Sequence, residues 1–178
     1  VVTRAAGTGR NFVALPIVVD PPEVTSGDCA AINTQLSSYS TSFQAYKRGR
    51  THNLTLAARA IDGIVVKPGR EFSVNAAVGP RLAGRGYQMA QVYIRGELVD
   101  GIGGGVCQVS STLFNAVLLA GLQVVERHPH PEAVPYVAPG RDATVAWGFK
   151  DFRFRNSASS PVGIIAIIKG SRLIVQIY

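Results

Sequence analysis

The sequence contains little cysteine and no long apolar segment, and both facts limit what the chain can be. Cys29 and Cys107 are the only cysteines among 178 residues, and the sequence alone does not show whether they pair. No apolar run reaches the length of a membrane span, and the chain starts at Val1 without a signal peptide. We therefore expect a piece of a longer protein whose own residues make no membrane contact.

Acidic residues are also scarce. Lys and Arg number 18 against 11 Asp and Glu, which gives a formal net charge of +7. This charge suits an anionic partner: nucleic acid, a membrane or anionic wall polymer, or a substrate that carries carboxylates. Aromatic residues do not alternate with the basic ones, and zinc-finger, helix-turn-helix and phosphate-loop spacings are absent. We therefore expect no nucleic-acid partner.

The composition is that of one compact domain. A hydrophobic fraction of 47% over 178 residues is enough for a sizeable core. Residues 1–24 place Pro16, Pro21 and Pro22 among short apolar runs, which predicts an arm or linker from an upstream region. We expect residues 25–178 to form the domain, as a monomeric unit of a larger chain.

Periodicity predicts helices early in this domain and mostly strands later. Apolar residues at helical spacing predict a helix around 54–61 that stops at Gly63, and capping residues at 25–28 predict a shorter helix that ends in a Ser-rich turn near Tyr39. Strand-like segments cover 64–67, 91–94, 97–99, 123–126, 133–137, 143–147, 152–154, 162–168 and 173–178. This order predicts an α+β fold with helices packed on an antiparallel sheet.

The centre of the sequence is a glycine run, a cysteine and an apolar helix. Helical spacing from Val109 onward and a stop at Gly121 predict a helix that begins near 106–108, with Cys107 in or just before its first turn. Unpaired N–H groups and the helix dipole at that position lower the pKa of a thiol. The same position also fits a small buried cysteine, so nucleophile and packed residue both remain open from position alone.

The glycines strengthen the first interpretation. Gly103, Gly104 and Gly105 cost conformational entropy, and we see no packing value in three consecutive glycines. Their main chain can approach a substrate closely, so we expect N–H groups near Gly105 and Cys107 to form an oxyanion hole. If Cys107 is catalytic it must stay free, and Cys29 is then expected to be a packed residue.

A cysteine nucleophile needs a base, and the base needs an orienting group. His52 lies in a basic patch and is expected at the surface, whereas His128 and His130 flank Pro129 at the end of a predicted strand. These two histidines could instead bind a metal together with Cys107, but no fourth ligand is evident.

Two aspartates are candidates for the orienting group. Asp142 opens the predicted strand 143–147 and is the first candidate, and Asp151 is the second. Asp142 is equally compatible with a plain turn residue after Gly140.

The chain resembles the VanW domain family, which is common in wall-associated proteins of Gram-positive and related bacteria. The block 103–113 carries the most specific part of the resemblance, which covers roughly residues 35 to 165. Further matching positions are 50–54, 61–63, 68–73, Asn75, Gly79, Gly86, Tyr87, Ala90, 120–122, Glu126, Arg127, His130, Tyr136, Val137, 139–145 and 151–156.

This resemblance implies a reaction and a cellular location. Some family members act as L,D-transpeptidases, which cross-link peptidoglycan stem peptides through a cysteine, so it implies Cys107 as nucleophile and an extracellular, wall-associated protein anchored through a segment before this one. It also selects His130 as the base, because His130 rather than His128 matches the family. One departure is Pro131, where the family usually has Ser.

Other residues are candidates for binding the substrate. Arg127 and Arg141 are suited to hold stem-peptide carboxylates bidentately, although either also fits a surface salt bridge. Side chains in the first helical turn are expected to cap N–H groups or touch the acyl group, capping being favoured: Gln108, Ser110 and Ser111.

The order of the three catalytic candidates is similar to papain-like and transglutaminase-like folds, as an analogy only. We expect neither metal nor cofactor. Two other functions stay open: a non-catalytic peptidoglycan-binding module, and a cysteine amidase or endopeptidase that hydrolyses stem peptides.

Overall fold

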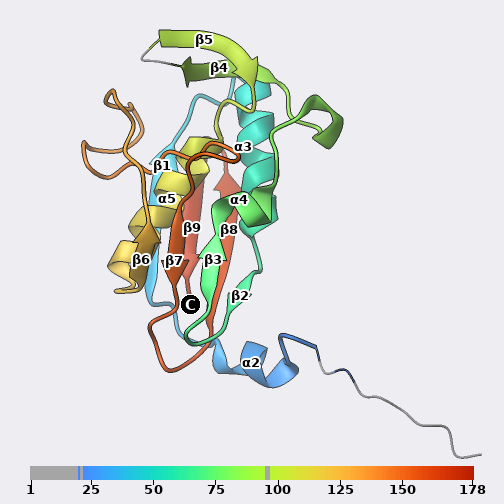
Figure 1. The fold of residues 1–178 in the computed structure, drawn as a ribbon, viewed down its shortest axis with the longest axis vertical. Helices are drawn as coiled ribbons and strands as arrows, with labels where there is room; N and C mark the ends of the chain where they lie inside the picture. The colour runs from blue at the N-terminus through green and yellow to red at the C-terminus, as the bar shows by residue number, and fades with distance from the viewer. Residues whose placement is uncertain (1–19, 21, 95–96) are drawn as a thin grey trace, which may run out of the picture.

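The computed structural model describes residues 20, 22–94 and 97–178. It is a mixed α and β protein in which every strand pairing is antiparallel. The helices are α2 (Ser26–Ala31), α3 (Arg48–Ile61), α4 (Val74–Val78) and α5 (Val106–Leu119), with a short 3-10 turn η1 (Ala83–Arg85). The predicted fold class, helices on antiparallel sheets, is therefore correct at this level (Figure 1).

The strands form three sheets. The largest has the order β1-β9-β8-β2, and it comprises β1 (Ser37–Ser42), β9 (Arg172–Ile177), β8 (Val162–Lys169) and β2 (Val65–Val66). A second sheet has the order β3-β7-β6, with β3 (Glu71–Ser73), β7 (Arg153–Arg155) and β6 (Gln123–Glu126). The hairpin of β4 (Met89–Ile94) and β5 (Glu97–Ile102) lies at one end of the molecule, opposite α2 (Figure 1).

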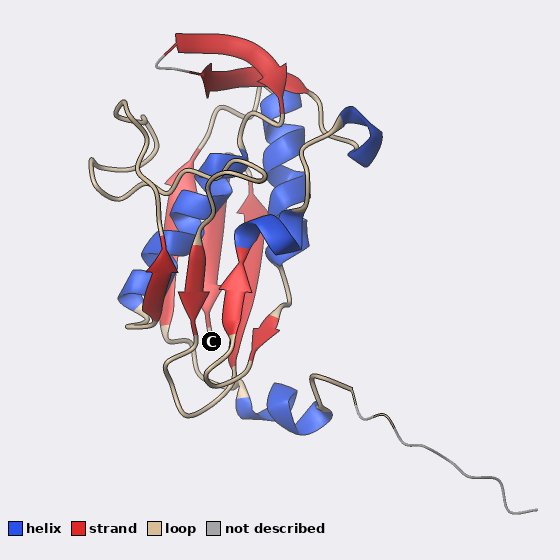
Figure 2. Cartoon of the chain, in the orientation of Figure 1, coloured by secondary structure: helices blue, strands red, loops and turns tan. Residues whose placement is uncertain are grey.

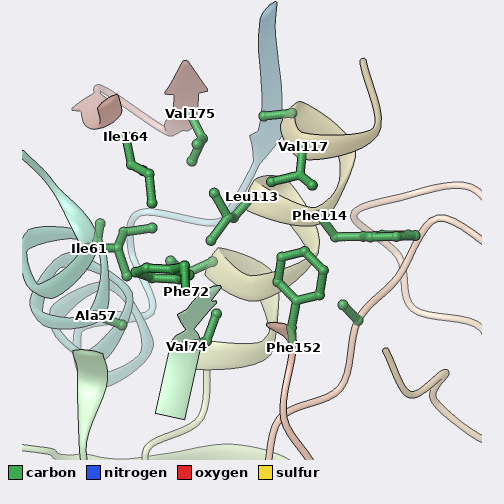
Figure 3. Packing of buried hydrophobic residues seen from close by; sticks show 14 of the residues in the cluster. Ala57, Ile61, Phe72, Val74, Leu113, Phe114, Val117, Phe152, Ile164 and Val175 are labelled. Atoms are coloured by element: carbon green, nitrogen blue, oxygen red, sulfur yellow. The ribbon is translucent and has the colours of Figure 1, made fainter. Parts of the chain in front are cut away.

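The core lies where α3 and α5 meet the sheets. Leu113 of α5 and Ile61 of α3 are fully buried, and Figure 3 shows their side chains pointing into one cluster with Ile164 of β8 and Val175 of β9. Phe114 of α5 meets Phe152 edge to face, with ring centroids 5.5 Å apart, which ties the segment before β7 to the same helix. Helix α5 is therefore buried from several sides, and its amino-terminal end is held by the fold.

The two long helices match the sequence prediction. In α3 the buried apolar residues are Leu54, Ala57, Ala58 and Ile61, as the periodicity predicts. Helix α5 begins at Val106 and is followed by Gly121 with φ of 69°. Cys107 therefore lies in the first turn of α5.

The Ser-rich segment was predicted wrongly as the end of a helix. Helix α2 does have capping residues at the predicted positions, with a capping box between Thr25 and Asp28. It ends at Ala31, however, and residues 37–42 form strand β1 beside β9. Its hydroxyl groups bond to α5: Ser37 Oγ donates to the Ala116 carbonyl at 2.7 Å, and Thr41 and Thr112 hydroxyls lie 2.9 Å apart. Hydroxyl side chains that bond to a helix can be buried in a strand, and such a strand shows no apolar pattern in its sequence.

Two predicted strands between β6 and β7 are also wrong. Residues 133–137 and 143–147 carry apolar side chains but form loops, apart from a single bridge between Ala146 and Lys150 (Figure 2). In the second segment the burial comes from contact with the core rather than from strand pairing, since Ala143 and Val145 belong to the hydrophobic cluster. The consequence is that Asp142 sits on a loop instead of at the start of a strand.

The amino-terminal part corrects one further expectation. Cys29 is exposed on α2 and both cysteines are free, so Cys29 is not a packed residue. Most of the predicted arm 1–24 lies outside the described residues. Within the residues that the structure describes, none of the helices combines the length and the apolar character that crossing a membrane requires.

Candidate active site

Cys107 stands at a helix start that has no side-chain cap. The N-cap of α5 is Gly105, with φ of 118°, and Gln108 N donates to its carbonyl at 3.0 Å. Among the described residues no acceptor is found for the N–H groups of Gly104, Gly105 and Cys107. The half-buried thiol donates to the Val145 carbonyl at 3.5 Å, so the nucleophile candidate lies beside unpaired backbone donors.

The glycines before Cys107 do have a packing role, contrary to the sequence-based argument. A Cβ at Gly104 would lie 2.3 Å from the Gln91 carbonyl oxygen of β4, and a Cβ at Gly105 would lie 2.9 Å from the Arg50 carbonyl oxygen of α3. The backbone of the loop thus passes directly against a strand and a helix. Only glycine permits this approach, and it fixes the start of α5 against α3 and the hairpin.

His130 and Asp142 come together as a buried pair. Nδ1 of His130 and Oδ2 of Asp142 are 2.6 Å apart, and the side chains are only 8% and 9% exposed. A carboxylate can only accept, so Nδ1 carries the hydrogen and Nε2 is left free to exchange a proton. The backbone N–H of His130 donates to the same carboxylate oxygen at 2.6 Å, which fixes both the ring and its main chain.

The electrostatics of the site favour a charged pair. Burial raises the pKa of the Cys107 thiol, but the hydrogen bond with His130 and the charges of His130 and Arg81 outweigh burial, and the pKa is lowered from its ordinary value. Burial lowers the pKa of His130, yet its hydrogen bonds and charge interactions with Cys107 and Asp142 raise it overall. Both shifts have the direction of a thiolate beside an imidazolium.

Asp142 is itself held by Arg127. Nε of Arg127 donates to the Asp142 carbonyl at 2.7 Å, and its Nη2 donates to Oδ1 of Asp142 at 2.9 Å. The guanidinium also lies 5.4 Å over the ring of Phe114. Burial raises the pKa of Asp142, but the hydrogen bonds from His130 lower it overall, so the carboxylate stays ionised.

Ser111 joins the Asp142 loop to the turn that carries Cys107. Its Oγ donates to the Cys107 carbonyl at 2.8 Å and accepts from the Ala143 N–H at 2.9 Å. One turn further on, Asn115 Nδ2 donates to the Arg141 carbonyl at 2.7 Å. Polar residues of α5 therefore replace the missing strand pairing and hold the loop in register with the nucleophile candidate.

The other candidates for base, orienting group and metal site lie elsewhere. His128 Nε2 pairs with Glu126 Oε1 at 2.9 Å, and exposed His52 pairs through Nε2 with the Gly86 carbonyl at 2.9 Å. Asp151 accepts from Ser73 Oγ, from Asn75 N at 2.9 Å and from Phe152 N at 2.8 Å, so it does not reach His130. Across the described chain no cluster of three or more metal-ligating side chains forms.

A cavity of about 1240 Å³ opens over Cys107 and His130. Its walls come from parts of the chain that are far apart in sequence: the start of α3, the loop at 80–82, the hairpin, the glycine run and the loops at 130–147. Basic side chains line it at Lys47, Arg48, Arg50 and Arg81, and Asp100 is the acidic residue among the lining residues. The arrangement offers a nucleophile, a base and donor groups to a large anionic ligand.

Comparison with known proteins identifies the family. A family model described as VanW like protein matches residues 49–178. The chain belongs to the VanW-like protein family. It is 48% identical over 173 residues to a Bacillus subtilis (strain 168) protein named "Uncharacterized protein YoaR", covering 97% of this chain and 57% of that protein.

A second relative extends the comparison. The chain is 30% identical over 157 residues to the "Vancomycin B-type resistance protein VanW" of Enterococcus faecalis (strain ATCC 700802 / V583), covering 85% of this chain and 55% of that protein. This VanW-like chain thus spans little more than half the length of either relative. No solved structure matches it, so the analogy to papain-like and transglutaminase-like folds gains no support.

The VanW-like chain does not bring all predicted substrate residues to the cavity. Gly104, Gly105 and Gln108 line it. Gln108 does not cap the helix, because its Oε1 accepts from Arg50 Nη2 at 2.8 Å and its Nε2 donates to β1. Ser110 and Ser111 are buried, and neither they nor Arg127 and Arg141 line the cavity. The preference for capping was wrong, because Gly105 stands at the N-cap and no side chain caps the helix.

Three cavity residues of this VanW-like site were missed by sequence reasoning. Arg50 lies 5.9 Å over the ring of Tyr136, and burial raises the pKa of Tyr136 well above its ordinary value, so its hydroxyl stays protonated. Arg81 is the third. In the sequence, only the family resemblance pointed to Arg50 and Tyr136, because both lie in segments that match the family. For Arg81 the sequence offered no indication beyond its place in a loop between two glycines.

Proposed function

We propose that the protein is a cysteine acyltransferase of the cell wall, an L,D-transpeptidase that joins peptidoglycan stem peptides. The observation that carries the proposal is that Cys107 and His130 line one large cavity while His130 is hydrogen-bonded to buried Asp142. A thiol of lowered pKa, a base with a fixed tautomer and a buried carboxylate form the arrangement that activates a cysteine for acyl transfer. The resistance named for the enterococcal relative is consistent with a wall substrate and an extracellular location.

In the first step the Cys107 thiolate attacks the carbonyl carbon of the amide that links the third residue of a donor tetrapeptide to its terminal D-alanine. The tetrahedral intermediate collapses as the C–N bond breaks, and the proton on His130 Nε2 passes to the leaving amine. D-alanine departs, and the acyl group stays on sulfur as a thioester. Asp142 keeps Nδ1 protonated and stabilises the imidazolium before the transfer.

In the second step the side-chain amine of an acceptor stem peptide attacks the thioester. His130 accepts the amine proton, the C–S bond breaks, and the thiolate is restored beside the imidazolium. We assign the oxyanion of both steps to the N–H groups of Gly105 and Cys107, because neither N–H has an acceptor among the described residues. Water in place of the amine would give hydrolysis instead.

The test is to incubate the protein with disaccharide-tetrapeptides and to follow muropeptides and intact protein mass. Cys107→Ala is the inactive variant, and Cys29→Ser is its matched control because Cys29 is the other free thiol and lies on exposed α2. We expect a thioester adduct and D-alanine release with the parent protein and with Cys29→Ser, together with new cross-linked dimers.

The other outcomes assign other functions. D-alanine release without dimers would make the protein a hydrolase that uses the same cysteine. Unchanged substrate with no adduct, from folded and reduced protein, would contradict catalysis and leave a peptidoglycan-binding module. In that case Cys107→Ala would bind stem peptides as well as the parent protein does.

A further inference from the structure

We propose that Arg81 holds the free carboxylate at the end of the donor peptide, one residue beyond the carbonyl that Cys107 attacks. This inference rests on the proposed function, and it names a feature that the substrate must carry: an uncapped, ionised carboxyl terminus. Arg81 belongs to the loop between α4 and η1 and lines the cavity together with Cys107 and Gly103.

Part of the guanidinium of Arg81 is fixed by the protein. Nη1 donates to Asn75 Oδ1 at 2.6 Å and to the Gly79 carbonyl at 3.1 Å. Asn75 is fixed in turn, because its Nδ2 donates to the Lys150 carbonyl at 2.9 Å. The Arg81 side chain also lies against the glycine run, since a Cβ at Gly103 would be 2.7 Å from Cβ of Arg81. The cation is therefore held beside the start of α5.

The other end of the guanidinium has no partner. Nη2 of Arg81 is buried and makes no hydrogen bond with any described residue. The nearby carboxylate of Asp151 already accepts from Ser73, Asn75 and Phe152, and none of the salt bridges within the described chain includes Arg81. A buried donor on a cation is costly when it stays unpaired, so a bound anion is its expected partner.

Arg81 and Cys107 line the same cavity, so one bound peptide can contact both. Neighbouring residues of a peptide are about 3.8 Å apart, so the carboxylate of a single leaving residue lies about one residue from the attacked carbonyl. The charge of Arg81 acts on the Cys107 thiol, whereas no hydrogen bond joins the two side chains within the described structure. A carboxylate that reaches Nη2 would complete the hydrogen bonding of the guanidinium, while Nη1 keeps its bonds to Asn75 and Gly79.

The experiment compares binding of two ligands that differ only at the terminus. A stem tetrapeptide with a free carboxyl terminus and the same peptide as carboxamide are titrated into the full chain that carries Cys107→Ala, which blocks turnover. We expect the acid to bind roughly ten- to a hundredfold more tightly than the amide, as a charge-assisted hydrogen bond provides. Adding Arg81→Gln removes this preference, and adding Arg81→Lys retains part of it.

Arg85→Gln is the matched control, because Arg85 is exposed in the adjacent turn η1 and does not line the cavity, and because this substitution changes the net charge equally. It must keep the preference for the acid, and thermal unfolding verifies that each variant is folded. If Arg81→Gln fails to fold, the preference for acid over amide is compared between Arg81→Lys and the Cys107→Ala parent, and this comparison tests the role of Arg81.

Failure of the inference and failure of the proposed function are distinguishable. Equal binding of acid and amide by the Cys107→Ala protein overturns the role of Arg81, and so does a preference that survives Arg81→Gln, even if cross-linked dimers form. An Arg81-dependent preference supports the role even if the parent protein forms no thioester.

Discussion

At the scale of single residues, we expect Asp142 to influence Cys107 through His130. Asp142→Asn keeps the shape but removes the charge that raises the pKa of His130. The imidazolium then loses its proton at lower pH, the thiolate loses its counter-charge, and the pKa of Cys107 rises. We expect the rate of alkylation of Cys107 by iodoacetamide near pH 7 to fall several-fold, and the midpoint of its pH profile to move to higher pH.

This measurement needs the Cys29→Ser background, because exposed Cys29 would otherwise react as well. Asp151→Asn is the matched comparison, since Asp151 bonds to Ser73 and Asn75 rather than to His130. We expect the midpoint of its alkylation pH profile to equal that of the parent protein. A profile that moves equally in both variants, or in neither, would contradict the assignment of Asp142.

Ser110 and Ser111 offer a second test at this scale, because they are neighbours with opposite environments. Ser111→Ala removes the acceptor of the buried Ala143 N–H and is expected to lower the free energy of unfolding by about 1–3 kcal/mol. Ser110 Oγ is buried without a partner among the described residues, so Ser110→Ala is expected to be neutral or stabilising. Chemical denaturation of both variants measures the difference, and equal losses would refute this account of the loop.

The residues of the site differ in how far the sequence could predict them. The place of Cys107 in the first turn of α5 was predictable, because the helix start is visible in the glycine run and the apolar period. The choice of His130 over His128 came from the family resemblance, since the sequence alone places both beside Pro129. Arg81 could not be predicted, because its relation to Cys107 depends on a loop that only the packing against Gly103 brings into place.

At the scale of elements, the start of α5 is positioned by backbone contacts that only glycine allows. Gly104 has no unusual φ, so Gly104→Ala tests sterics alone, and its Cβ would lie 2.3 Å from the Gln91 carbonyl oxygen of β4. We expect a loss of about 1–3 kcal/mol in the free energy of unfolding, as in overpacked cores, with loss of Cys107 reactivity.

Gly84→Ala is the control for this prediction. Gly84 in η1 has no positive φ, and none of the described atoms outside its own turn lies within 4 Å of the point that a Cβ would occupy, so an added methyl group meets open space. Thermal unfolding of the two variants is expected to show a large shift for Gly104→Ala and little change for Gly84→Ala. A tolerated Gly104→Ala would mean that the hairpin is free to move away from the glycine run.

Elements were predictable where their burial follows a simple period. Helices α3 and α5 and the β8–β9 hairpin have apolar residues at helical or alternate spacing, and their positions were correct. Strand β1 was missed because its inward side chains are hydroxyls that bond to α5. The segments 133–137 and 143–147 were overpredicted because apolar residues of a loop look like a strand in sequence. The second segment is held by Ser111 of α5 rather than by strand pairing.

At the scale of the whole molecule, the fold extends beyond the part that the family model covers. That match begins at residue 49, yet β1 lies before it and pairs with β9 along its whole length, from Ser37 opposite Ile177 to Ser42 opposite Arg172. Phe43 adds a buried side chain to the core. Without β1, the edge of β9 would be exposed to water, and the groups of α5 that bond to the β1 hydroxyls would lose their partners.

We therefore expect a chain of residues 33–178 to fold and a chain of residues 44–178 to remain unfolded. The first lacks α2, which has no buried residue, whereas the second also lacks β1 and Phe43. Loss of β1 also removes the Thr41 hydroxyl that Gln108 donates to at 2.9 Å, one residue from Cys107. Circular dichroism and amide exchange decide between the outcomes, and a cooperative unfolding transition in the shorter chain would show that β1 is dispensable for the site.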